Sequence, residues 1–335
     1  MKAPRCWSAG SARSTATSAS SVWGASCTVV TPIASRLRSI AFDPSSERNI
    51  MNRRATPRPE YDTPTLVTQG NVTRHLWGDE ESGRVGDEVL ISSHELHALI
   101  FTLAPGGRFG HSPDNRTVFA ADEVYAVLEG TIAVINPATG QTVRAETGDF
   151  VFFRRDTWHH GINWGEGPVR VLEFFSPPPA AGAASAYAKE QPYLARTLHG
   201  EPEAIGHWPM DRAELAGAAT MTHLRLGDVR WRAEGDLQVG LVCSTEYLTV
   251  TWSKLLAGQR SLERSHEGDA LVHLTRGELH VHTPDGNGPN WWRLLPGESL
   301  AIPRGFAYQM VNQSGAPIEA VIASAPGYLS GGAGG

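Results

Sequence analysis

The sequence predicts an all-β protein that consists of two similar units, and three observations support this prediction. From about residue 61 onward, short runs of Val, Ile, Leu, Phe and Tyr alternate with Gly, Pro, Asn and Asp, as in strands joined by turns. The 35 glycines and 22 prolines among 335 residues favour many turns over long helices. Segments of the first half also recur in the second half, and a repeat of this size indicates two barrels or sandwiches in tandem.

Three pairs of segments carry the repeat. Their glycines and apolar positions match, and the pairs are 103–108 with 255–260, 128–140 with 275–286, and 148–163 with 297–312. The repeat predicts one β domain over residues 61–180 and a second over residues 223–330. The Pro- and Ala-rich stretch that follows the first domain predicts a linker with short helices over residues 181–222.

Residues 1–60 differ in composition from the rest and predict a disordered N-terminal tail. Ser, Thr, Ala and Arg dominate the first 50 residues, and no apolar period appears there. An organelle transit peptide would share this composition, whereas a secretory signal would need a sustained apolar region. Met51 opens a segment that looks like a natural N-terminus, so the first 50 residues are a tail, a transit peptide or sequence upstream of the working start.

The composition limits the classes of function. Hydrophobic residues make up 41% and charged residues 19%, which fits a globular protein with a core. The formal net charge of -6 offers no positive field for nucleic acid, and no apolar run approaches the roughly 18 residues of a membrane span. Three cysteines form neither a disulfide framework nor a paired zinc motif. We therefore expect a cytoplasmic protein whose partner is a small-molecule substrate.

The repeated segments resemble the two signature motifs of the cupin superfamily, whose members are small jelly-roll β-barrels. DEVYAVLEGTIAV, residues 122–134, is similar to the Glu-to-Gly part of the first motif, and residues 148–163 are similar to the second motif. The resemblance implies two tandem cupin (jelly-roll β-barrel) domains, with Glu123 and His159 as metal ligands. Asn163 matches the Asn of the second motif and is a candidate for substrate binding. Since cupins host many reactions and also inert binding proteins, the fold does not name the activity.

The third metal ligand is open, because the His-x-His pair of the first cupin motif is missing. Thr117 and Phe119 stand near its expected positions, and His111 is the histidine nearby. With His111 the ligands would be two histidines and a carboxylate, the set typical of non-haem Fe(II) sites. Without His111 only two ligands remain. Fe(II) is the expected metal, with Mn, Ni or Zn as alternatives.

Four further residues are candidates for catalysis or substrate binding. Tyr125 shares the strand face of Glu123 and could donate a hydrogen bond to a ligand. Arg155, close before His159, could hold a substrate carboxylate or pair locally with an acidic neighbour, and Arg108 is a second candidate for the substrate anion. Trp158 could line a pocket or pack between layers.

The second half has lost the cupin ligand pattern. Ala270 stands at the Glu position and Tyr308 at the second-motif His, so we expect a structural domain that could also contribute a homodimer interface. The resemblance therefore implies a metal-dependent two-domain enzyme, foremost a non-haem Fe(II) dioxygenase acting on a small aromatic or oxygenated substrate that bears a carboxylate. The alternatives are a metal-dependent isomerase, cyclase or lyase, and a non-catalytic protein that binds a small molecule.

Overall fold

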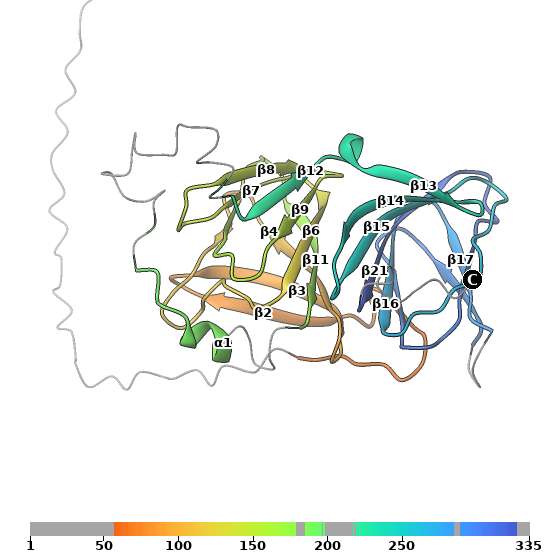
Figure 1. Ribbon diagram of the computed structural model, residues 1–335, viewed down its shortest axis with the longest axis horizontal. Coiled ribbons are helices and arrows are strands. Elements are labelled where there is room, and N and C mark those ends of the chain that lie inside the picture. Colours follow the sequence, from red (N-terminus) through yellow and green to blue (C-terminus); the bar gives the residue numbers. More distant parts are fainter. Residues whose placement is uncertain are drawn as a thin grey trace, which may run out of the picture. The chain divides into compact units, whose positions relative to one another are not determined.

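The computed structural model describes residues 57–178, 185–195, 197, 217, 219–284 and 289–326. Nearly all regular structure in these ranges is strand, as the sequence predicts, and α1 (Ser185–Glu190) is a short helix in the predicted linker (Figure 1). The predicted tail lies almost entirely outside the described residues. No helix among the described residues is long and apolar enough to cross a membrane.

The first barrel consists of a seven-stranded and a four-stranded antiparallel sheet. The large sheet has the order β12-β9-β6-β11-β4-β3-β2, and the small sheet has the order β5-β10-β7-β8. Its strands in chain order are β2 (Thr73–Asp79), β3 (Gly83–Ser92), β4 (His97–Leu103), β5 (Arg108–Phe109), β6 (Asp122–Glu129), β7 (Thr131–Ile135), β8 (Thr142–Glu146), β9 (Phe150–Phe153), β10 (His160–Asn163) and β11 (Val169–Ser176).

The second barrel repeats this plan, which confirms the internal repeat. Its large sheet has the order β1-β19-β16-β21-β15-β14-β13, and its small sheet has the order β18-β17-β20. Its strands in chain order are β13 (Arg230–Glu234), β14 (Leu237–Ser244), β15 (Thr249–Leu255), β16 (Asp269–Arg276), β17 (Leu279–His282), β18 (Trp291–Leu294), β19 (Ser299–Ile302), β20 (Gln309–Val311) and β21 (Ile318–Ala325).

The two barrels exchange edge strands, a feature that the sequence motifs did not reveal. β1 (Thr65–Val67) precedes the first barrel but pairs antiparallel with β19 of the second. β12 (Met221–Leu224) precedes the second barrel but pairs antiparallel with β9 of the first. Each added strand covers backbone groups that would otherwise lie open at a sheet edge. The exchange therefore ties the barrels together through main-chain hydrogen bonds.

Apolar side chains fill three main core clusters. One lies inside each barrel, and the third joins residues of both large sheets, where the rings of Phe150 and Trp252 meet at 5.7 Å. The interior of the second barrel is apolar along β16, β19 and β21. The interior of the first barrel differs, because buried ionisable side chains interrupt its apolar lining. This difference locates the candidate site.

Candidate metal centre

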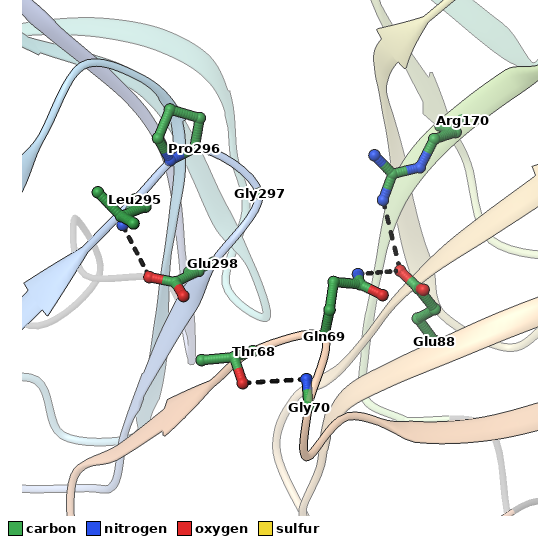
Figure 2. Close-up of a pocket in the computed structure, with 9 residues that line it drawn as sticks. All are labelled: Thr68, Gln69, Gly70, Glu88, Arg170, Leu295, Pro296, Gly297 and Glu298. Carbon is green, nitrogen blue, oxygen red and sulfur yellow. Dashed lines mark hydrogen bonds and ion pairs between the residues drawn. The ribbon is translucent and has the colours of Figure 1, made fainter.

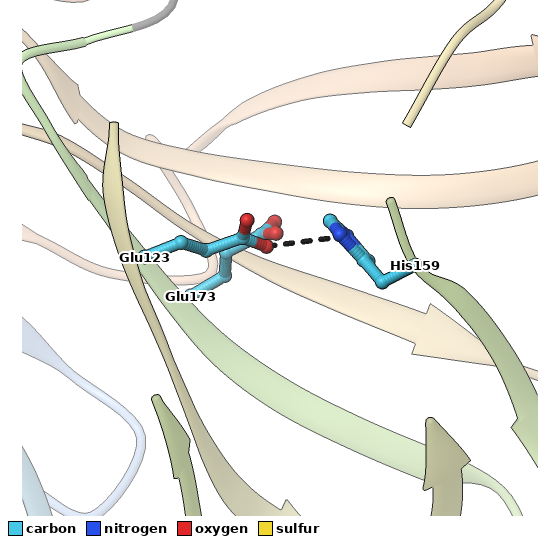
Figure 3. Close-up of side chains that lie close together, drawn as sticks. All are labelled: Glu123, His159 and Glu173. Atoms are coloured by element: carbon cyan, nitrogen blue, oxygen red, sulfur yellow. Dashed lines mark ion pairs between the residues drawn. The ribbon is translucent and has the colours of Figure 1, made fainter. Parts of the chain in front are cut away.

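Three ionisable side chains meet inside the first barrel. Glu123 comes from β6, Glu173 from the neighbouring β11, and His159 from the residue before β10 (Figure 3). One ligand atom from each side chain lies within 4.8 Å of the other two. The three residues are only 2%, 7% and 1% exposed, respectively. Such a buried group of two carboxylates and an imidazole could hold a divalent metal ion.

Hydrogen bonds set the orientation of the His159 ring. Its Nδ1 lies 3.3 Å from the carbonyl oxygen of Thr157, so Nδ1–H donates there and Nε2 keeps its lone pair. Nε2 lies 3.3 Å from Oε1 of Glu123 and 3.1 Å from the hydroxyl of Tyr125. A backbone carbonyl that fixes one ring nitrogen while the other faces inward is the usual arrangement of a metal-binding histidine.

The Oε1 atom of Glu123 is a buried polar atom without a hydrogen-bond partner. The lone pair of His159 Nε2 faces this atom. Two electron-pair donors at this distance need a proton or a cation between them. A divalent metal ion would satisfy both atoms together with Glu173, so the residues fit the metal that the resemblance implies.

Burial shifts the pKa of every member of the cluster toward its uncharged form. Burial, reinforced by the adjacent Glu173 carboxyl, raises the pKa of Glu123 well above its usual range. Burial also raises the pKa of Glu173 to about 7 and lowers the pKa of His159 to about 4. Without a cation the carboxyls therefore retain protons that a metal ion would displace.

The second barrel shows that the fold does not need these charges. The repeat aligns Glu123, Tyr125, His159 and Glu173 with Ala270, Val272, Tyr308 and Ile322. The strand registers agree, since Tyr125 lies opposite Glu173 and Val272 lies opposite Ile322. All four residues of the second barrel belong to its apolar core. Because burying carboxylates is costly, their retention in one barrel indicates chemistry rather than packing.

The comparisons with known proteins agree with this architecture. A family model described as a cupin domain matches residues 99–175, which include Glu123, His159 and Glu173. Two tandem cupin barrels make up this chain. No curated protein sequence is significantly similar to it.

Solved structures share the two-barrel cupin fold at low sequence identity. AerE from Microcystis aeruginosa is 10% identical with a TM-score of 0.50, over 78% of this chain and 97% of that one. A point mutant of Bacillus subtilis oxalate decarboxylase OxdC is 11% identical, with a TM-score of 0.52 over 80% and 78%. Lactobacillus farciminis oxalate decarboxylase in its formate complex is 13% identical, with a TM-score of 0.51 over 78% and 86%. These likenesses show the fold alone.

His111, the predicted third ligand, is not part of the group formed by Glu123, His159 and Glu173. His111 Nδ1 lies 2.6 Å from Nε2 of His160, and His111 Nε2 lies 2.5 Å from the carbonyl oxygen of Leu194. Both ring nitrogens are therefore engaged, and Glu173 instead of His111 joins Glu123 and His159. The sequence motifs missed Glu173. Its signal was a single carboxylate in the otherwise apolar run VLEFF, where an unpaired charge would be costly.

The structure shows which residues stand in place of the missing His-x-His pair of the cupin motif. The backbone N–H of His159 donates to the carbonyl of Thr117, as that of Tyr308 does to Arg264 in the second barrel. Thr117 and Phe119 therefore occupy the predicted positions. The ring of Phe119 packs against that of His159 at 5.7 Å, so an apolar wall stands where the motif has a histidine.

The predicted arginines lie outside the metal cluster. The side chain of Arg155 is 60% exposed and pairs with Asp156 at 3.5 Å, which is the local pair considered as the alternative. Arg108 is exposed on β5. Neither arginine belongs to the group formed by Glu123, His159 and Glu173.

Trp158 and Asn163 have packing partners in the structure. Trp158 packs against the ring of His111 and joins a small cluster that contains Val118 and Ala188 of α1. The amide of Asn163 donates to three backbone carbonyls, those of Leu103, Ala104 and Gly167. Its N–H groups are therefore not available to a substrate. Asn312 makes the equivalent bonds in the second barrel.

A cavity of about 750 Å³ lies away from the metal cluster (Figure 2). Residues Thr68–Gly70 and Leu295–Glu298 line it together with Glu88 and Arg170. Gln69 donates to Glu88 at 2.9 Å, and Arg170 pairs with the same carboxylate at 3.4 Å. Arg170 is thus paired with Glu88, and Glu298 accepts a hydrogen bond from the backbone N–H of Leu295. The buried cluster in the first barrel remains the candidate site.

Proposed function

We propose that this chain is a metal-dependent enzyme whose first cupin barrel binds one divalent cation through Glu123, His159 and Glu173. The observation that carries the proposal is the buried cluster itself, whose two carboxyl positions are Ala270 and Ile322 and whose histidine position is Tyr308 in the second barrel of the same chain. The second barrel then serves stability, and the reaction belongs to the first.

The donor set favours Fe(II) or Mn(II). Two carboxylates and one imidazole offer mostly oxygen ligands, which suit these ions better than the softer sets that bind Zn or Cu(I). Two negative charges also balance one divalent cation, because the His159 ring is neutral when its Nε2 lone pair is free to bind. Fe(II), the metal expected from the sequence, remains the first candidate. The observed ligand set has one more carboxylate and one fewer histidine than the sequence predicts.

A non-haem Fe(II) dioxygenase is the activity that this site supports best. Bound Fe(II) would supply open coordination positions for a substrate oxygen and for dioxygen, since the protein offers three ligands. Tyr125 hydrogen bonds to His159 at 3.1 Å and interacts with both carboxyls, so its hydroxyl is placed to hold or pass a proton. The surrounding aromatic rings keep water away from the cluster.

A metal-dependent isomerase, cyclase or lyase is the second candidate. It is favoured by Glu173, whose pKa burial raises to about 7, because a carboxyl that titrates near neutral pH is suited to proton transfer. Oxygen uptake separates the two candidates. Substrate turnover that consumes dioxygen in equal amount supports the dioxygenase, and turnover unchanged under argon supports the second candidate.

Metal content tests the site itself. The full-length chain is reconstituted with Fe(II) or Mn(II) under argon, desalted and measured by mass spectrometry. We expect about one ion per chain in the wild type, and loss of the ion in His159→Ala and Glu173→Ala. Tyr308→Phe, at the position equivalent to His159, is the matched control and should keep the ion. A wild type that binds no ion, or variants that bind as much as the wild type, would refute the proposal.

A further inference from the structure

The metal cluster is almost closed off from solvent, so an ion that enters or leaves it requires movement of the residues that cover it. Glu123, Glu173 and His159 are 2%, 7% and 1% exposed. The ring of Phe119 packs against that of His159 at 5.7 Å and against that of Phe175 at 4.9 Å. Exchange at such a site is easiest through an element that opens at a lower free energy than the strands around it.

Residues 187–195 form a strap that packs on this covering layer. Ala188 of α1 is buried in a small cluster with Val118, against which Phe119 packs. Phe119 also contacts the ring of His159. A single aromatic residue therefore links the strap to a residue of the metal cluster.

Arg116 is the main anchor of the strap. Its Nη1 donates to the carbonyl oxygens of Ala188 and Gln191 at 2.8 Å each, and its guanidinium lies 5.2 Å from the ring centre of Tyr193. Hydrogen bonds from a charged donor are stronger than those between neutral groups. The Nε of Arg116 is buried without a hydrogen-bond partner, and opening of the strap would give this N–H to water. Arg116 therefore holds the strap through directed bonds, at a cost that opening relieves.

His111 anchors the strap near its other end. Its Nε2 lies 2.5 Å from the carbonyl oxygen of Leu194, and its ring lies 5.5 Å from the ring of Tyr193. The two anchors therefore hold the strap at both ends through its main-chain carbonyls.

The loop that carries both anchors is longer in the first barrel than in the second. The repeat aligns Arg108 with Arg260 and Glu123 with Ala270, and the loop between the first pair of positions is five residues longer in the first barrel. His111 and Arg116 belong to this longer loop. The barrel that has the metal cluster therefore also has the loop that binds the strap.

The strap has few other contacts with the barrel. Among the described residues 187–195, Ala188 alone is buried, and none of them pairs with a strand. Tyr187 donates a hydrogen bond to the exposed Asp156. A segment with little buried apolar area and a few hydrogen bonds opens at a lower free energy than the strands of a core.

We propose that the strap gates the metal cluster, and that Arg116 and His111 hold it closed until it opens to let the ion enter or leave. The inference rests on the proposed metal site and adds the route by which that site exchanges its ion. Arg116 and His111 are positioning residues in this device, because they bond to carbonyl oxygens of the strap.

The rate of metal exchange tests the gate. The full-length chain is loaded with Mn(II), its metal content is measured, and release into excess EDTA is followed by electron paramagnetic resonance. We expect Arg116→Ala to release Mn(II) at least about tenfold faster than the wild type, and His111→Ala to release it faster by a smaller factor. Arg144→Ala, which removes an exposed arginine of β8 paired with Glu146, is the matched control and should keep the wild-type rate.

The dissociation constant separates a gate from a support of the ligands. A gate opens before both entry and release, so both rates should rise by the same factor and the Kd for Mn(II) should stay unchanged. Release at the wild-type rate from either loaded variant would overturn the inference. Faster release with unchanged entry and a proportional rise in Kd would also overturn it, because the residues would then support the ligands. A wild type that takes up no Mn(II) would instead refute the metal site.

Discussion

Replacing Glu173 by isoleucine, the residue of the second barrel at the same place, should stabilise the metal-free protein above neutral pH. Ile322 occupies the equivalent register opposite Val272 and lies within an apolar core. Glu173 is buried opposite Tyr125, and burial raises its pKa from 4.5 to about 7. The folded state therefore prefers the neutral carboxyl, and the unfolded state loses its proton at lower pH.

The sign and the size follow from this difference in pKa. Below pH 4.5 the Glu173 carboxyl is protonated in both states and does not reduce the free energy of unfolding of the wild type. As the pH rises from 4.5 through 7, the unfolded state ionises first and the free energy of unfolding falls. A pKa difference of about 2.5 corresponds to about 3 kcal/mol. Glu173→Ile removes this loss, so its gain over the wild type should grow by about 2 to 3 kcal/mol between pH 5 and pH 8.

Urea unfolding of both proteins at pH 5 and pH 8, in the presence of a chelator, measures the effect. Taking the difference between variant and wild type cancels the titration of groups remote from Glu173. The pKa of Glu123 and of Asp87, which Glu173 raises, falls in the variant, and this change adds to the gain at high pH. Glu88→Gln is the control, because that carboxylate is partly exposed and paired with Arg170. If the gain of Glu173→Ile is the same at both pH values, burial does not keep the carboxyl protonated and the reasoning fails. In a separate series without the chelator, added Mn(II) should stabilise the wild type and leave the variant unchanged.

Three further outcomes follow from the structure. His111→Ala should keep the metal ion, measured by mass spectrometry after reconstitution, because both ring nitrogens of His111 bond elsewhere; its loss would return His111 to the ligand set. Burial lowers the pKa of His97 and His273 to about 4, so stability should fall by up to about 3 kcal/mol per residue as the pH drops from 6.5 toward 4, and His273→Asn should reduce that fall in urea unfolding. Asn163→Ala should lower the free energy of unfolding by about 2 to 3 kcal/mol, because it leaves buried carbonyls unpaired, whereas a loss below about 0.5 kcal/mol would contradict this role.

The sequence predicts the two-barrel fold more completely than it predicts the candidate metal site. Turn residues and the internal repeat predict both barrels, because strand period and glycine positions are local features. Glu123 and His159 were identified for a similar reason, since each stands at a fixed distance from a turn. Glu173 was not, because its partner strand is distant in the chain and no local motif marks it. The strand exchange of β1 and β12 likewise depends on pairing between distant segments.

Side-chain direction is the second reason why the site in the structure differs from the site that the sequence predicts. An arginine close to His159 in sequence suggested an anion site, but a turn can point its side chains either way. The turn before His159 contains Asp156, which has a positive φ of 64°, and the side chains of Arg155 and Asp156 both lie at the surface. Sequence spacing carries no information on that choice.

That turn extends the contrast between the barrels. The equivalent of Asp156 in the second barrel is Gly305, with φ of 77°, so the position requires a left-handed backbone that glycine adopts without strain. The first barrel uses an aspartate there, and its carboxylate accepts a hydrogen bond from Tyr187 of α1. Strained backbone and buried ionisable groups both occur in the first barrel, while the second barrel has Gly305 at the turn and no carboxyl at the positions of Glu123 and Glu173. Because strain and buried charge persist where they serve a site, their shared location supports chemistry in the first barrel independently of any motif.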